Sequence, residues 1–148
     1  MKGNAIKFLQ GMLWFVCAFH IAVGAGLNLI PGMAPFMAEV YGAEVNWTPE
    51  FTYIIKPLGA FMFALGLICI AAARNPLKNQ MIIYGFATLF AIRAMQRLLF
   101  AQEISDNFSI GMSRNIVNMI FFLAMAAALI VLERLARKES AGPAAASD

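Results

Sequence analysis

Charged side chains are scarce in this chain. Only 13% of its 148 residues are Asp, Glu, Lys or Arg, whereas 61% are hydrophobic. A soluble domain of this length carries about 25% charged and about 45–50% apolar residues. The shortage of charge therefore argues against a soluble globular domain and favours a chain that exposes most of its surface to lipid.

Cysteine and histidine are also rare, with two cysteines and one histidine in the whole chain. No CxxC pair occurs, which argues against dithiol redox chemistry. Cys17 and Cys69 both fall in apolar runs. The rise per residue along antiparallel helices places them at depths roughly 10 Å apart, so we expect no disulfide between them.

The sequence motifs that carry hydrolytic or phosphoryl-transfer chemistry are absent as well. The chain has no Ser-His-Asp arrangement, no paired carboxylates, no HExxH, no metal-ligand spacing and no Gly-rich phosphate loop. Its apolar runs contain no internal acid of the kind that proton-coupled transporters use. A hydrolase or a pump is disfavoured, so we assign no catalytic residue and no metal ligand, and we favour a non-enzymatic protein.

The chain has four long apolar runs instead, each reaching the roughly 20 residues that a helix needs to cross a bilayer. A pattern of period two does not recur, which argues against a barrel. We predict an all-α integral membrane four-helix bundle over residues 1–135 and a disordered tail over 136–148, where small residues, Gly, Pro and Ser gather. The runs cover about residues 8–30, 51–73, 80–100 and 110–132.

Basic residues outside the runs gather on one side of the predicted bundle. Lys2 and Lys7 precede the first run, and Arg74 and Lys78 lie in the turn between the second and third. The loop over residues 31–50 contains glutamates but no Lys or Arg. The positive-inside rule therefore places both termini in the cytoplasm. We assign the protein to a bacterial inner membrane. Membrane lipids are expected partners, and nothing indicates nucleic acid.

The loop after the first run contains a short segment with a helical pattern, APFMAEVY. It places Phe36, Met37 and Val40 on one face and Glu39 on the other, which predicts a short helix lying in the membrane interface. The triplet Thr48-Pro49-Glu50 then predicts a helix start, with a capping hydroxyl, a proline in the first position and an acid in the first turn.

Four basic residues fall within the runs, near the end opposite the termini. Arg93 and Arg97 lie one turn apart on one helix face, roughly 20 Å and 26 Å from the cytoplasmic edge of a core about 30 Å thick. Lys56 and Arg114 lie roughly 8 Å and 6 Å below the outer surface. An unpaired charge in hydrocarbon costs about 2.5–3.5 kcal/mol, and arginine suits phosphate and carboxylate. We therefore expect these four residues to form a site for an anion or a head group.

A simpler interpretation stays open, because long basic side chains near helix ends reach the interface on their own. This interpretation explains the positions of Arg97, Arg114 and Lys56 well. It explains Arg93, the deepest of the four, least well. His20 lies near the depth of Arg93 and is a candidate ligand of a haem or chlorin. Asparagines inside helices typically bond neighbouring helices. The residues expected to support the basic site are His20, Asn28, Gln96, Glu103, Asn115 and Asn118.

Three segments stand out for their polar positions: LGLICIAAARNPLKNQ at the end of the second run, RAMQRLL late in the third, and NIVN at the start of the fourth. Together with the four-run pattern they resemble the DoxX-like family of small bacterial membrane proteins. The resemblance covers about residues 8–135. It implies a four-helix inner-membrane fold and, for some members, association with quinone- or thiol-linked redox partners, and it assigns no catalytic residue.

Three functions remain as expectations. The first is a non-catalytic accessory or structural subunit of a larger membrane complex of the respiratory or photosynthetic type, with other subunits as partners. The alternative is a membrane protein that binds a lipid or quinone head group in a basic pocket near the outer face, with no intrinsic cofactor. A weaker alternative is a quinone-linked redox protein.

Overall fold

The computed structural model describes residues 4–142, and over that range the chain forms helices and no strand. Four of the helices, α1, α3, α4 and α6, are long and apolar enough to cross a membrane. The prediction of a multi-pass helical membrane protein is thereby confirmed at the level of length and composition. The helices are α1 (Asn4–Leu29), α2 (Met33–Tyr41), α3 (Pro49–Arg74), α4 (Gln80–Leu99), α5 (Ala101–Phe108) and α6 (Met112–Ala141).

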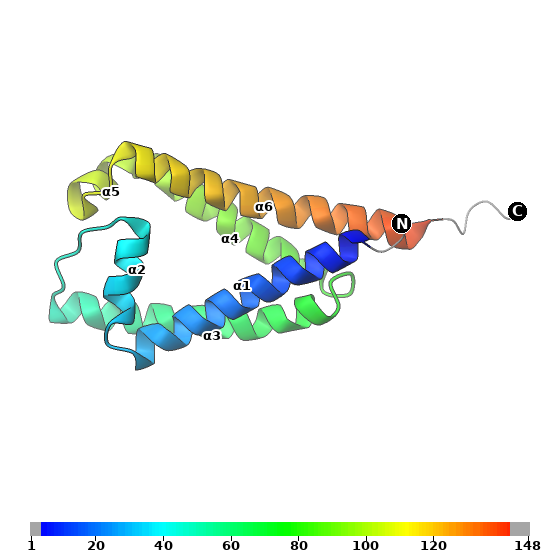
Figure 1. Ribbon diagram of the computed structural model, residues 1–148, viewed down its shortest axis with the longest axis horizontal. Helices are drawn as coiled ribbons and strands as arrows, with labels where there is room; N and C mark the ends of the chain where they lie inside the picture. Colours follow the sequence, from blue (N-terminus) through cyan, green and yellow to red (C-terminus); the bar gives the residue numbers. More distant parts are fainter. Residues whose placement is uncertain (1–3, 143–148) are drawn as a thin grey trace, which may run out of the picture.

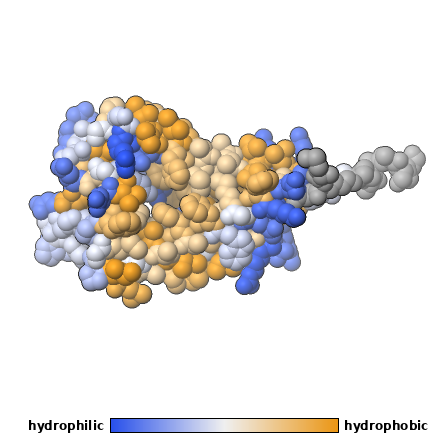
Figure 2. Space-filling model, viewed as in Figure 1, coloured by the Kyte–Doolittle hydropathy of each residue, from blue (hydrophilic) through white to orange (hydrophobic). Residues whose placement is uncertain are grey.

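The surface is divided along the long axis of the molecule. Figure 2 shows a wide hydrophobic zone in the middle, with hydrophilic residues gathered toward both ends. A helical membrane protein needs this distribution, because hydrocarbon covers the middle of its surface and water or lipid head groups cover the ends.

The four long helices form two pairs rather than an evenly packed bundle. One pair is α1 with α3, the other is α4 with α6, and α1 also packs against α6. The pairs lie together at the end where α1 begins and α6 ends, and they diverge toward the opposite end (Figure 1). The Ala5 amide donates to Glu139 Oε2 at 3.2 Å, which ties the two terminal segments together. On which side of a membrane this end lies stays a prediction.

Glycines bring the backbones of α1 and α3 into close contact. A Cβ atom placed on Gly24 would lie 2.4 Å from the Phe63 backbone nitrogen, and one on Gly66 would lie 2.9 Å from the Ile21 nitrogen. No side chain larger than hydrogen fits at such distances without moving a helix. This close approach makes α1 and α3 one tightly packed unit.

The same close packing corrects the expected separation of the cysteines. Cys17 and Cys69 are buried and free, and both lie at the α1–α3 interface. Cys69 Sγ also lies 3.6 Å from the Leu13 carbonyl oxygen, one turn from Cys17. The depth difference of roughly 10 Å that the sequence suggested is wrong, because α1 begins before its apolar run and the two helices are shifted along each other.

A buried carboxylate joins α4 to α6 near the terminal end. Glu133 has 0% of its side chain exposed and accepts hydrogen bonds from Tyr84 Oη at 3.1 Å and from Arg137 Nη2 at 2.5 Å. Arg137 Nη2 also donates to Gln80 Oε1 at 2.6 Å. This cluster fixes the second pair where the molecule is narrow.

Two short helices occupy the wide end. The short helix predicted from APFMAEVY is present as α2, which ends at Gly42 in the left-handed conformation (φ 72°). Its location in a membrane interface stays a prediction. Thr48 caps α3 as expected, accepting a hydrogen bond from the Phe51 amide at 3.2 Å. The sequence did not predict α5, because its residues looked like a polar loop.

The expected tail begins later than residue 136. Helix α6 continues to Ala141, past the predicted boundary at residue 135, so the first part of that tail is helical. Charged residues continue the helix there because they lie beyond the apolar run, where solvent or head groups surround them. Residues 143–148 of the predicted tail lie outside the described residues.

Candidate ligand-binding site

A cavity of about 370 Å³ lies at the wide end, where the helical pairs diverge. Ligand pockets typically span roughly 300–1,000 Å³. Side chains from all six helices line it, and most of them are apolar. Arg93, Gln96 and Arg97 of α4 supply its charged and amide groups, and no acidic residue of the described chain is among its lining.

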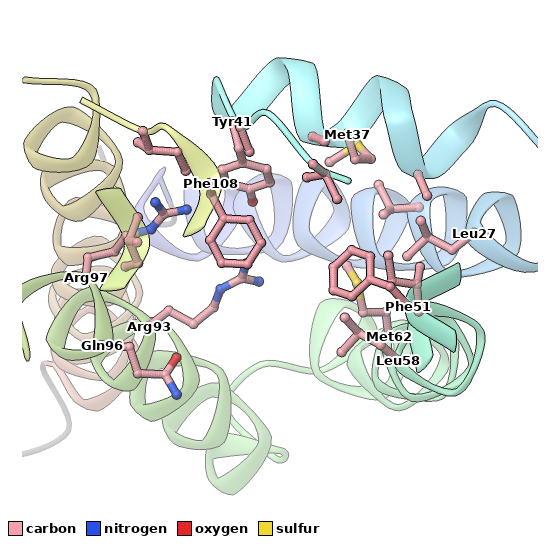
Figure 3. Close-up of a pocket in the computed structure, with 18 of the residues that line it drawn as sticks. Leu27, Met37, Tyr41, Phe51, Leu58, Met62, Arg93, Gln96, Arg97 and Phe108 are labelled. Atoms are coloured by element: carbon pink, nitrogen blue, oxygen red, sulfur yellow. The ribbon is translucent and has the colours of Figure 1, made fainter. Parts of the chain in front are cut away.

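The polar and apolar parts of the lining face each other across the cavity. Figure 3 shows Arg93 and Arg97 on one side, with Leu58 and Met62 of α3 on the other. Met37 and Tyr41 reach the same space from α2. The arrangement suits a molecule with one electron-rich end and one apolar end.

Arg93 has no acceptor within the described part of the chain. Over residues 4–142 its guanidinium makes no hydrogen bond or ion pair, and the ion pair found there, between Glu133 and Arg137, lies near the other end. The Arg93 Cζ atom lies 4.6 Å from the centre of the Phe122 ring. Such a cation–π contact stabilises the charge by about 0.5–2 kcal/mol but leaves the guanidinium N–H groups available.

Arg97 is held more firmly than Arg93. Its Nη1 donates to Asn115 Oδ1 at 3.2 Å, and Asn115 Nδ2 donates back to the Arg97 carbonyl oxygen at 2.7 Å. The Arg97 Cζ atom lies 5.6 Å from the centre of the Tyr41 ring. Only 4% of Asn115 is exposed, so the pair fixes where the second positive charge enters the cavity.

Arg114 holds α2 in place and does not line the cavity. Its Nη2 donates to the Val40 carbonyl oxygen at 2.6 Å, and Asn118 Nδ2 lies 3.4 Å from the Tyr41 carbonyl oxygen. Both acceptors belong to the last turn of α2, where carbonyl groups lack partners within the helix and where a cation is favourable. Arg114 is therefore a support of the cavity wall.

The structure separates the other predicted residues from the cavity. Lys56 is exposed on α3 and is absent from the lining, so the expectation that four basic residues converge is wrong for Lys56 as well as for Arg114. Asn28 bonds α1 to α3, with its Nδ2 3.1 Å from the Lys56 carbonyl oxygen. Glu103 is exposed on α5, away from both arginines. Gln96 lines the cavity, as expected.

His20 lies beside a second, smaller cavity of about 200 Å³. Its Nδ1 lies 2.8 Å from the Val16 carbonyl oxygen, and its ring centre lies 5.3 Å from that of Phe86. The expectation that His20 ligates a haem or chlorin stays a prediction. Within the described residues, no group of three or more His, Cys, Asp and Glu side chains lies close enough to hold a metal ion.

Aromatic faces are the part of the site that the sequence left unassigned. Phe122 and Tyr41 carry the two arginine side chains, and with Phe19 and Met37 they also form the wall shared by the two cavities. The chain has 13 phenylalanines and 3 tyrosines, and no spacing among them marks these two. Their role follows from the packing of α6 against α4 and from the contact of Tyr41 with Arg97, which are tertiary features.

Comparison of the chain with models of protein families, with curated proteins and with solved structures finds no match. The resemblance to DoxX-like proteins therefore stays a prediction.

Proposed function

We propose that this protein binds a membrane amphiphile whose head carries an anionic oxygen, with Arg93 and Arg97 holding the head and the apolar walls holding the tail. Phosphate and carboxylate heads of lipids share this chemistry, and a quinone carbonyl is a weaker acceptor of the same kind. Expected partners are therefore membrane lipids. The bacterial inner membrane is the proposed location, and the cavity would open toward its outer face.

The observation that supports the proposal is the unpartnered guanidinium of Arg93 in a cavity without an acid. Two cations in a mostly apolar space are costly unless an anion compensates them. Simple extension of the side chain to the interface does not describe Arg93, since it points into the cavity beside Phe122. A bound head group would accept the free N–H groups and neutralise the charge.

The other expected functions stay predictions. An accessory subunit of a respiratory or photosynthetic complex and a quinone-linked redox protein are each compatible with a helical membrane protein. Neither explains why Arg93 and Arg97 face one cavity. Head-group binding explains it directly, and we therefore prefer it.

Lipid analysis of the purified protein tests the proposal. The wild-type protein, extracted in a mild non-ionic detergent and washed, should retain an anionic lipid at about one molecule per chain, detected by native mass spectrometry and lipid extraction. Arg93→Gln should lower the retained amount at least tenfold, because one charge-assisted contact is worth about 1.5–3 kcal/mol. Arg93→Lys should keep part of it.

Arg134→Gln is the matched control. It removes the same charge, but Arg134 is exposed on α6 near the terminal end. It should leave the bound lipid unchanged. Equal lipid content in wild type, Arg93→Gln and Arg134→Gln would contradict the proposal, as would retention of zwitterionic lipids alone. Retention of a quinone in place of a lipid would show that the arginines bind a carbonyl oxygen instead of a phosphate or carboxylate.

A further inference from the structure

His20 presents an unused nitrogen to the smaller cavity. The residue is 2% exposed, and its Nδ1 is bonded to the Val16 carbonyl oxygen at 2.8 Å. No described side-chain nitrogen or oxygen that is fully enclosed lacks a hydrogen-bond partner. Since Nε2 has no hydrogen-bond partner among residues 4–142, it must keep access to open space, and the space that His20 lines is this cavity.

The partner of Nδ1 decides what Nε2 can do. A carbonyl oxygen only accepts hydrogen bonds, so Nδ1 of His20 carries the proton. An unpaired charge in an apolar surrounding is costly, so the imidazole is neutral. Nε2 therefore offers a lone pair and recognises a hydrogen-bond donor.

The cavity around this lone pair has the size and lining of a site for one ring. An apolar cavity of about 150 Å³ binds benzene in another protein, and this one measures about 200 Å³. Phe15, Phe90 and Phe121 are among its walls. Asn118 also lines it, and because its amide nitrogen faces the Tyr41 carbonyl, its amide oxygen remains a second acceptor.

We infer that the His20 cavity is a binding site for a hydroxylated aromatic ring, whose O–H group donates to His20 Nε2 while its face packs against the surrounding phenylalanines. This site is separate in chemistry from the arginine cavity, which requires an acceptor. The two cavities share a wall formed by Phe19, Met37, Tyr41 and Phe122. The inference does not depend on the lipid proposal, and each can fail alone.

The sole histidine of the chain makes the test specific. The protein is labelled with ¹⁵N-histidine, purified without a histidine tag in detergent micelles, and titrated with 4-ethylphenol or with its methyl ether, 4-ethylanisole. The ether has nearly the same shape and partitions into micelles, but it cannot donate. The phenol should move the Nε2 resonance and bind about tenfold more tightly than the ether, because the hydrogen bond is formed in an apolar site.

Two variants separate recognition from loss of folding. His20→Phe keeps an aromatic ring and removes Nε2, so it should bind the phenol and the ether equally. His20→Gln keeps an acceptor near the same place and should recover part of the preference. Equal affinity of the wild type for both probes would overturn the inference. So would phenol binding that leaves the Nε2 resonance unmoved, or an undiminished preference in a folded His20→Phe protein. Arg134→Gln, at an exposed position of α6 that lines neither cavity, should not change the preference.

Discussion

Arg97 and Asn115 are bonded to each other in both directions. The arginine side chain donates to the asparagine side chain at 3.2 Å, and the asparagine side chain donates to the arginine backbone at 2.7 Å. The pair joins the last turn of α4 to the first turn of α6 at the wide end. It also fixes the direction of a guanidinium that lies over Tyr41 and lines the larger cavity.

Removal of the Asn115 amide should therefore loosen this end of the second pair. We expect Asn115→Ala to lower the free energy of unfolding by about 1 kcal/mol, in the range of hydrogen bonds between membrane helices. Unfolding in mixed micelles with increasing SDS measures the change. A double-mutant cycle with Arg97→Met should give a coupling energy above about 0.5 kcal/mol. A coupling near zero would contradict the bond between the two side chains, and Ser113→Ala, at an exposed neighbouring position, serves as the neutral control.

Gly24 should be the most sensitive glycine of α1. Gly24→Ala places a methyl group 2.4 Å from the Phe63 backbone nitrogen, so α1 and α3 must separate. We expect a loss of about 2 kcal/mol, typical of an overpacked interface. Gly11→Ala is the matched control, since nothing lies within 4 Å of the added atom. It should be neutral or slightly stabilising because alanine favours helix. Equal effects of the two substitutions would argue against the close helix contact.

Arg137 and Glu133 should differ in their sensitivity to substitution. Arg137→Ala leaves a carboxylate that is 0% exposed with Tyr84 as its remaining donor, and we expect a loss of about 2 kcal/mol. The loss stays below that of a fully buried pair because 51% of the Arg137 side chain is exposed. Glu133→Gln keeps the shape and removes the buried charge, so it should cost less. SDS unfolding of both variants measures the order, and the reverse order would refute this account of the cluster.

Arg114 should control the mobility of α2. Arg114→Ala removes the donor to the Val40 carbonyl oxygen and a cation from the last turn of α2. We expect backbone amides of α2 to exchange several-fold faster with deuterium, measured by mass spectrometry on the peptide that covers Met33–Tyr41. Exchange in α6 near Arg137 should stay unchanged. Arg114→Lys should restore part of the protection, and unchanged exchange in Arg114→Ala would show that other contacts hold α2.

The helices other than α5 could be predicted from the sequence because each of them depends on local features. The four apolar runs identify α1, α3, α4 and α6, the pattern of APFMAEVY identifies α2, and Thr48 marks the start of α3. The approach of Arg93 to Arg97 could also be predicted, since residues one turn apart share a helix face. Both side chains line one cavity because of that spacing and because the α1–α3 pair diverges from the α4–α6 pair at this end.

The packing of the helices could not be predicted, for a reason particular to membranes. Lipid tails are as apolar as leucine, so hydropathy does not distinguish a side chain that faces lipid from one that faces another helix. Lys56 and Arg97 therefore looked alike in the sequence, although one is exposed and the other lines a cavity. Glu133 follows the last apolar run and was assigned no role, yet α6 continues past it and buries it against Tyr84.

The link between Glu44 and Phe108 constrains how the molecule can change its shape. The Glu44 amide donates to the Phe108 carbonyl oxygen at 2.8 Å, which joins the loop after α2 to the end of α5. The α1–α3 and α4–α6 pairs are thus connected at both ends of the molecule. They cannot separate further at the wide end without breaking this hydrogen bond. A ligand larger than the cavity can therefore bind only if side chains such as Met37 rotate, or if the hydrogen bond between Glu44 and Phe108 breaks.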